Sequence, residues 1–332
     1  SHGPEWDCGD PDGAGPCWPG GQNSLLLSDE DGKLNNVTTT NLPAFSDFSH
    51  GSTVIDFDYD GDMDIFVNNS GGSPLYNPDF SYLLENDGFG HFTVAADGHT
   101  PLSIKSPLKG RNGILPEGEW PPGQSSWAVA IDANGDGHTD LDFGRTGRWL
   151  DGGVQDYRTL LALNSGSGSF EYVPGDAWPS PSWSTTGVVQ HALVYDLNND
   201  GFDDQLLHSS DSDWSKPWMQ VLISNGDGTF RDETSTRNSP QEFDVMSDYQ
   251  LHDLDGDGHP DLFSDTNFGQ VDVRINDGEG HFRLLSKDWV EMTESWVVLD
   301  VDNDGGSDFF ESSNLGLRLH KMNKPYGPEM DG

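Results

Sequence analysis

Short runs rich in apolar residues alternate with polar, glycine-containing turns along most of the chain. Five such runs stand directly before an aspartate-rich segment of nine residues, at 52–55, 127–131, 192–195, 249–252 and 296–299. Five more follow it, at 65–67, 141–143, 206–207, 262–263 and 309–310. Because these runs are short, bounded by turn residues and rich in β-branched and aromatic types, they predict β-strands rather than helices.

The aspartate-rich segment follows the pattern Asp-x-Asp/Asn-x-Asp-Gly-x-x-Asp in all five copies. The glycine lets the chain turn sharply, and oxygen-bearing side chains at positions 1, 3, 5 and 9 suit the six to eight hard ligands of calcium. We therefore expect about five Ca²⁺ ions, one per copy. The expected ligands are Asp56, Asp58, Asp60 and Asp64; Asp132, Asn134, Asp136 and Asp140; Asp196, Asn198, Asp200 and Asp204; Asp253, Asp255, Asp257 and Asp261; and Asp300, Asp302, Asp304 and Asp308.

Two other interpretations of the pattern fit less well. An EF-hand needs helices on both sides and a glutamate at position 12. That position holds Val67, Phe143, Leu207, Ser264 and Glu311, and the flanking runs predict strands. Acidic turns without metal would place three or four carboxylates together with nothing to offset their repulsion.

A second repeated pattern predicts β-hairpins between the metal segments. It begins at Asn86, Asn164, Asn225 and Asn276, with a weaker copy at Ser28, and places Asn and Gly between apolar runs. Together the two patterns predict an all-β propeller of about five four-stranded blades, each with a calcium loop. The first repeated pattern in the chain is a hairpin and the last is an aspartate-rich segment. We therefore expect N- and C-terminal strands to pair and close the ring. A further predicted strand at 316–320 duplicates what the N-terminus would supply, and the sequence leaves that closure open.

These motifs resemble the FG-GAP/VCBS repeats of integrin α-subunit propellers and of many secreted microbial proteins, over residues 24–320. The resemblance implies a β-propeller with a calcium loop joining the two inner strands of each blade. Asn134 and Asn198 replace aspartate at position 3, and the last copy contains an additional Gly306, so we expect weaker binding at those three sites. The family includes adhesion proteins, glycan-binding proteins and enzymes, so the resemblance leaves the function open.

Composition narrows the class of partner. The chain of 332 residues has 16 basic and 57 acidic residues, a formal net charge of −41, which disfavours nucleic acid and anionic lipid as partners. No apolar run reaches 18 residues, so we expect no membrane span. Its 11 Trp, 17 Phe and 8 Tyr provide apolar area for burial and argue against a disordered chain.

The chain divides into a leader (1–23), a propeller (24–321) with a loop insertion at 97–126, and a tail (322–332). Cys8 and Cys17 are the only cysteines and lie in the Gly/Pro/Asp-rich leader. A disulfide closing this small loop is expected, with two free thiols as the alternative, and it implies an oxidising compartment. We therefore expect a secreted protein, extracellular or at the cell surface.

The residues just before each predicted inner strand should lie at the blade end opposite the calcium loops. The ligand-binding candidates there are His50, Trp127, Gln190, His191, Tyr249 and Trp296. Aromatic and amide groups suit sugar rings, whose apolar faces stack and whose hydroxyls form hydrogen bonds. For Trp127 and Trp296, packing in the core is the alternative.

The sequence favours a calcium-binding propeller whose partner is an extracellular glycan or protein, bound through the face opposite the calcium loops. The alternative is a polysaccharide-active enzyme, a lyase or a glycosidase, acting on an anionic glycan. His50, His191 and Tyr249 are weak candidates for the base and acid that a lyase requires. The chain has no Gly-x-Ser-x-Gly, HExxH or phosphate-binding loop motif.

Overall fold

The computed structural model describes fourteen stretches of the chain, and every structural statement below concerns them. They are residues 21–44, 46–47, 49–69, 81–95, 127–144, 159–173, 179, 188–210, 217–237, 248–265, 271–284, 295–301, 307–313 and 316–320. Cys8, Cys17, the predicted insertion at 97–126 and the tail at 322–332 lie outside them. The chain forms two compact units, Ser1–Asp132 with Asp136–Ala177, and Ala133–Gly135 with Trp178–Gly332, which are described separately.

The first unit contains a hairpin, a short helix and two four-stranded sheets. The hairpin pairs β1 (Leu26–Ser28) with β2 (Leu34–Asn36), and α1 (Thr38–Asn41) follows it. Blade 1 consists of β3 (Ser49–Ile55), β4 (Asp64–Asn69), β5 (Tyr82–Asn86) and β6 (Phe92–Val94). Blade 2 consists of β7 (Trp127–Ile131), β8 (Asp140–Gly144), β9 (Leu160–Asn164) and β10 (Phe170–Tyr172).

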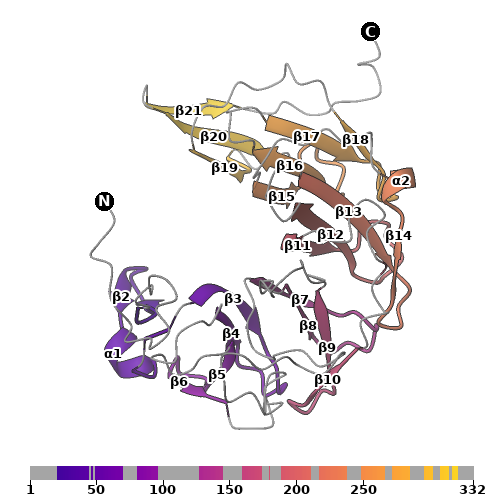
Figure 1. Ribbon diagram of the computed structural model, residues 1–332. Helices are drawn as coiled ribbons and strands as arrows, with labels where there is room; N and C mark the ends of the chain where they lie inside the picture. Colours follow the sequence, from indigo (N-terminus) through magenta and orange to yellow (C-terminus); the bar gives the residue numbers. More distant parts are fainter. Residues whose placement is uncertain are drawn as a thin grey trace, which may run out of the picture. The chain divides into compact units, whose positions relative to one another are not determined.

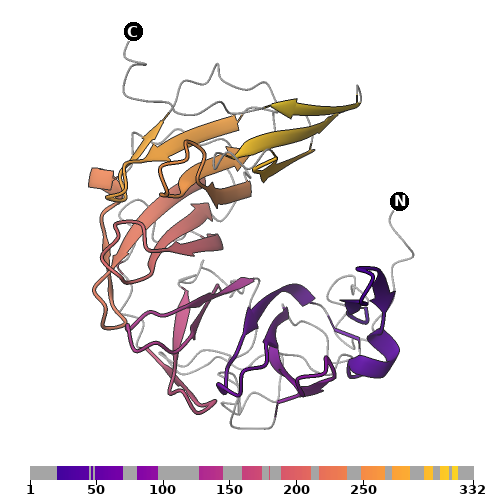
Figure 2. The same cartoon turned by 180° about the vertical axis from the view of Figure 1, so that it is seen from behind.

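The second unit contains three sheets, whose strands run side by side in Figures 1 and 2. Blade 3 consists of β11 (Val188–Tyr195), β12 (Asp204–Ser210), β13 (Pro217–Ser224) and β14 (Phe230–Asp232), followed by α2 (Thr234–Arg237). Blade 4 consists of β15 (Asp248–His252), β16 (Asp261–Asp265), β17 (Val271–Asn276) and β18 (Phe282–Leu284). Blade 5 consists of β19 (Ser295–Leu299), β20 (Asp308–Ser313) and β21 (Gly316–His320).

Every sheet is an antiparallel meander in which strands that follow each other in sequence also pair in space. This order confirms the predicted strands, the predicted hairpins and the blade as the repeating unit. The additional strand expected at 316–320 is β21, which pairs with β20, so blade 5 has a third strand of its own. Closure of a ring by N- and C-terminal strands involves both units and stays a prediction.

Thin apolar layers between neighbouring blades form the core of each unit. In the first unit, Phe66 of blade 1 packs near Phe143 of blade 2, with ring centroids 6.1 Å apart, in a buried cluster that includes Ile55 and Leu141. In the second unit, side chains of blades 3 and 4 form a comparable cluster that includes Val221 and Phe282. Such layers need few apolar residues, which agrees with a chain that is only 33% hydrophobic.

The two helices are single turns of four residues each. Within the described stretches, no helix has the length and apolar character needed to cross a membrane.

Candidate metal sites

The aspartate-rich segments lie where the sequence predicts them, in the loops between the first and second strands of the blades. The ninth-position aspartate is the first residue of the second strand in all five blades: Asp64, Asp140, Asp204, Asp261 and Asp308. Each loop is therefore fixed at its end by a paired strand. Asp302 and Asp304 of the fifth loop lie outside the described residues.

Two residues with positive φ turn each of the first four loops. Position 6 is always glycine, with φ between 81° at Gly137 and 97° at Gly61. Position 4 also has positive φ, and it is glycine in two loops but Tyr59 (φ 62°) and Asn199 (φ 56°) in the others. A left-handed tyrosine is strained unless neighbouring groups hold it. The ring of Tyr59 packs edge-on against His138, and its hydroxyl accepts a hydrogen bond from the Thr139 N–H.

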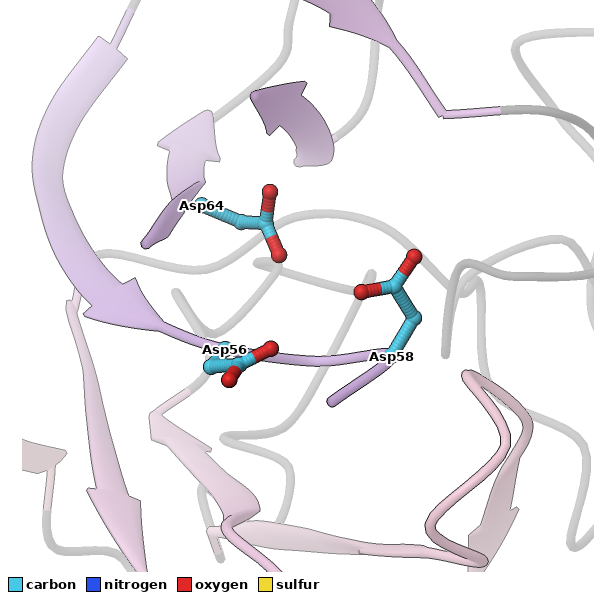
Figure 3. A group of neighbouring side chains, drawn as sticks. All are labelled: Asp56, Asp58 and Asp64. Carbon is cyan, nitrogen blue, oxygen red and sulfur yellow. The ribbon is translucent and has the colours of Figure 1, made fainter. Parts of the chain in front are cut away.

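Three carboxylates meet in the loops that begin at Asp56 and at Asp253. One ligand oxygen each from Asp56, Asp58 and Asp64 lies within 4.8 Å of the other two, and the same holds for Asp253, Asp255 and Asp261. Figure 3 shows the first of these groups, with the three carboxylates turned toward the space between them. The first-, third- and ninth-position side chains thus converge.

Backbone N–H groups hold the first-position carboxylate in place. One of its oxygens accepts a hydrogen bond from the position 6 glycine in four loops: 3.2 Å from Gly61, 2.9 Å from Gly137, 2.9 Å from Gly201 and 3.0 Å from Gly258. The fifth-position carboxylate accepts in turn from the N–H two residues ahead, as in Asp257 from His259 at 2.8 Å. The acidic side chains are therefore positioned by the loop backbone itself.

The ninth-position aspartate has a second role that the sequence did not predict. Asp261 is fully buried, and its two oxygens accept hydrogen bonds from the Leu254 and Asn276 N–H groups, both at 2.8 Å. Asp204 does the same with Leu197 at 3.0 Å and Ser224 at 2.9 Å. The carboxylate thus joins its own loop to the end of the third strand.

Burial makes the charged form of these aspartates costly. It raises the pKa of Asp64 to about 6 and those of Asp204 and Asp261 to about 7, although the backbone N–H groups act in the opposite direction. Neighbouring aspartates of each loop raise these pKa values further. A cation in the loop would reverse this balance by favouring the carboxylate.

The loops also contact the hairpins of the blades. The position 7 side chain packs on the first glycine of its own hairpin: a Cβ at Gly278 would lie 2.5 Å from His259, and one at Gly226 would lie 2.7 Å from Phe202. The position 2 carbonyl accepts from the next blade, as in Phe57 from the Asn164 side chain at 2.8 Å. These contacts connect these loops to their own hairpins and, at Phe57, to the neighbouring blade.

The candidates at the opposite strand ends have different environments. His50 and His191 are exposed and Gln190 is half-buried, whereas Trp127 and Tyr249 are buried. Trp127 lies against Gly144 on the neighbouring strand, as core packing requires. The side chain of Trp296 lies outside the described residues.

His50 and Gln190 occupy the same structural position in two blades. The register of β3 with β4 shifts between Ser49 and Gly51, and that of β11 with β12 shifts between Val189 and His191. His50 and Gln190 are thus the additional residues of two β-bulges, devices that re-aim side chains and are frequent beside binding sites. His191 and Tyr249 both lie near His208, which the sequence analysis did not select.

A family model for the FG-GAP-like repeat matches residues 11–67, 196–264 and 253–310, which is just over half of the chain. The chain belongs to the FG-GAP-like repeat family. The repeats that the model matches contain the loops beginning at Asp56, Asp196, Asp253 and Asp300. No curated protein matches this FG-GAP chain.

Among solved structures, the FG-GAP chain resembles an Agrocybe aegerita lectin described as recognising non-reducing terminal N-acetylglucosamine. The TM-score is 0.50 at 18% identity, covering 84% of this chain and 64% of the lectin chain, so this chain spans less than two thirds of the lectin. A putative exo-β-1,3-galactanase from Bifidobacterium bifidum matches at 11% identity with a TM-score of 0.42, covering 92% of this chain and 97% of the other. The blade sheets and the fold similarity to the lectin confirm the predicted all-β propeller class.

Proposed function

We propose that this chain is an exported propeller that is stabilised by calcium and binds carbohydrate. The metal part of this proposal rests on the spacing of the aspartate oxygens. In each of two loops, one oxygen from each of three aspartates lies within 4.8 Å of the other two. Calcium binds oxygen at 2.3–2.6 Å, so two ligands on opposite sides of one ion lie at most about 5 Å apart. One ion can therefore contact all three carboxylates.

The donor set fits calcium better than other ions. Only oxygen donors converge in the loops beginning at Asp56 and Asp253, which disfavours the nitrogen- and sulfur-seeking metals. Magnesium demands near-ideal octahedral geometry and usually retains several waters, so it rarely uses such all-protein sites. Calcium would offset the repulsion within each loop and so stabilise the contacts between neighbouring blades.

The carbohydrate part rests on the strand ends away from the metal loops. There His50 in the first unit, and Gln190 and His191 in the second, offer polar groups on bulged or adjacent positions of the first strands of their blades. The fold similarity to a lectin supports a sugar as the partner. Export follows from the predicted Cys8–Cys17 disulfide and from the millimolar calcium available outside cells, where extracellular calcium modules bind with modest affinity.

A glycan array with the calcium-loaded protein tests the carbohydrate proposal, with N-acetylglucosamine-terminated and uronate-containing glycans on the panel. We expect saturable binding that weakens in Gln190→Ala and His50→Ala, with Asp31→Ala as an exposed control outside both regions. The bound glycans should be recovered unchanged. Unsaturated or new reducing ends would instead support the enzyme alternative, and no binding to any glycan by folded protein would contradict the proposal.

A further inference from the structure

Two histidines lie directly opposite each other in blade 3, at a distance from the acidic loop. In the antiparallel pairing of β11 with β12, His191 faces His208. Directly opposite residues share one face of the sheet, with Cβ atoms about 4.5–5.5 Å apart. His208 lies four residues after Asp204, the end of the acidic loop, which corresponds to about 13 Å along the strand.

The His208 side chain is enclosed and has an unsatisfied nitrogen. It is 5% exposed, and its Nε2 has no hydrogen-bond partner among the residues that the structure describes. The ring of Tyr249 lies against it, with centroids 4.3 Å apart. Burying a polar group without a hydrogen-bond partner destabilises the folded state, so a ligand at this nitrogen would remove that penalty.

The surroundings keep the His208 imidazole neutral. Burial lowers its pKa to about 3, and the neighbouring His191 acts in the same direction. Leu206 and Met219 lie on the same face of the blade, so apolar side chains flank the position of His208. A neutral imidazole in an apolar shell is the form that coordinates metal ions.

We propose that His191 and His208 form a binding site for a transition-metal ion of the Zn²⁺ or Cu²⁺ class. Two imidazole nitrogens favour such ions over calcium, which takes oxygen ligands. A sugar hydroxyl is the competing ligand, but a 5% exposed imidazole is more accessible to a small ion than to a sugar ring. Because His191 is exposed, the remaining coordination positions would be open to solvent.

Blade 1 provides an internal comparison. The positions that correspond to His191 and His208 are Gly51 and Asn68 in this blade, and they pair across β3 and β4. The exposed His50 therefore lies beside a pair that contains no histidine. His50 therefore shares the bulge environment without the histidine pair. It supplies the matched control.

The experiment is a titration of the chelator-treated full chain with Cu²⁺ and separately with Zn²⁺, in excess Ca²⁺ so that the acidic loops are filled. We expect one ion per chain, with Cu²⁺ tighter than Zn²⁺ and a visible Cu²⁺–imidazole absorption band. His191→Ala should weaken binding by more than the roughly 10–100-fold loss typical of residues that only support a metal ligand, and His50→Ala should leave it unchanged. His208→Gln should act like His191→Ala, and circular dichroism would verify that this buried variant folds.

Every outcome decides the question. Wild-type protein that binds neither ion under these conditions overturns the proposal. Binding that is as tight in His191→Ala as in wild type also overturns it, because the ion would then occupy another site. If His191→Ala leaves metal binding intact but weakens glycan binding on the array, the pair belongs to sugar recognition instead. The metal titrations themselves require no known glycan ligand.

Discussion

The loop at residues 253–261 (the Asp253 loop) and the loop at residues 196–204 (the Asp196 loop) belong to neighbouring blades of one unit and share one backbone design. In both, the position 6 glycine donates to the first aspartate, and the ninth aspartate accepts from the second residue and from the end of the third strand. They differ at position 3, which is Asp255 in one and Asn198 in the other.

Among the four expected ligand positions this is the one difference, and it changes the hydrogen bonding and electrostatics of the ligand set. The Asn198 amide donates a hydrogen bond to the Asp200 carboxylate at 3.0 Å, so it occupies an oxygen that a cation would use. An ionised Asp255 has no hydrogen to donate and offers only oxygens at this position. Burial raises the pKa of Asp255, and Asp257 and Asp253 raise it further. The comparison teaches that the backbone fixes where an ion would bind, whereas the third position adjusts how strongly the loop attracts it.

The largest expected effect is at position 9, which is a buried aspartate in both loops. Asp261→Ala leaves the Leu254 and Asn276 N–H groups without an acceptor. Each buried group left unpaired lowers the free energy of unfolding by about 1–3 kcal/mol. Urea unfolding in excess chelator should therefore show a loss of several kcal/mol, and Asp204→Ala should show a similar loss. The exposed Asp257→Ala is the control within the same loop. Equal unfolding free energies for Asp261→Ala and Asp257→Ala would contradict the structural role of the ninth aspartate.

A reciprocal exchange tests the position where the loops differ. Asp255→Asn should weaken calcium binding at the Asp253 loop, and Asn198→Asp should strengthen it at the Asp196 loop, because ligand charge tunes calcium affinity. We expect about a tenfold change in Kd in each direction, which is about 1.4 kcal/mol. Calorimetric titration of calcium into the two single variants and into the variant with both substitutions measures the change in Kd. Changes of the same sign in both variants would show that position 3 does not set the difference.

The two loops should also share a pH dependence. Because the pKa values of Asp204 and Asp261 are raised to about 7, the folded chain without calcium binds more protons than the unfolded chain between about pH 4 and 7. Its stability should therefore fall as the pH rises through this window. Calcium needs the deprotonated carboxylates, so the loaded protein should not show this fall.

Melting curves at pH 5 and pH 7.5, with chelator and with calcium, measure the effect. The neutral buried His208 opposes it, since its lowered pKa removes stability below about pH 6.5. Asp261→Asn isolates the aspartate contribution, because it should flatten the dependence in chelator relative to wild type. An identical pH dependence in this variant would exclude Asp261 as a cause.

The metal loops could be predicted from the sequence because their chemistry is local and repeated. All four expected ligands of each loop fall within nine residues, and glycine at position 6 identifies the turn. The second role of the ninth aspartate could not be predicted in this way. Its hydrogen-bond donors on the third strand lie 15 to 24 residues away, and only the pairing of the strands brings them close.

The strand ends opposite the loops were harder to predict for a similar reason. His50 and Gln190 were selected from the sequence, but their shared place in β-bulges depends on pairing with the second strand. His208 follows two leucines in a run that predicts a buried strand, and only its register with His191 and its contact with Tyr249 distinguish it from a core residue. Trp127 has an aromatic ring suited to sugar, yet the ring is buried and lies against Gly144 on the next strand.

A count of bound calcium with matched melting curves tests the central claim most directly. Protein dialysed to equilibrium against millimolar free calcium should bind about five ions per chain above the buffer level by elemental analysis, and chelation should lower the melting temperature sharply because the ion binds only the folded loops. The double variant Asp56→Asn/Asp253→Asn should retain about two fewer ions. Fewer than about one ion per chain, with a melting temperature unchanged by chelator, would contradict the account.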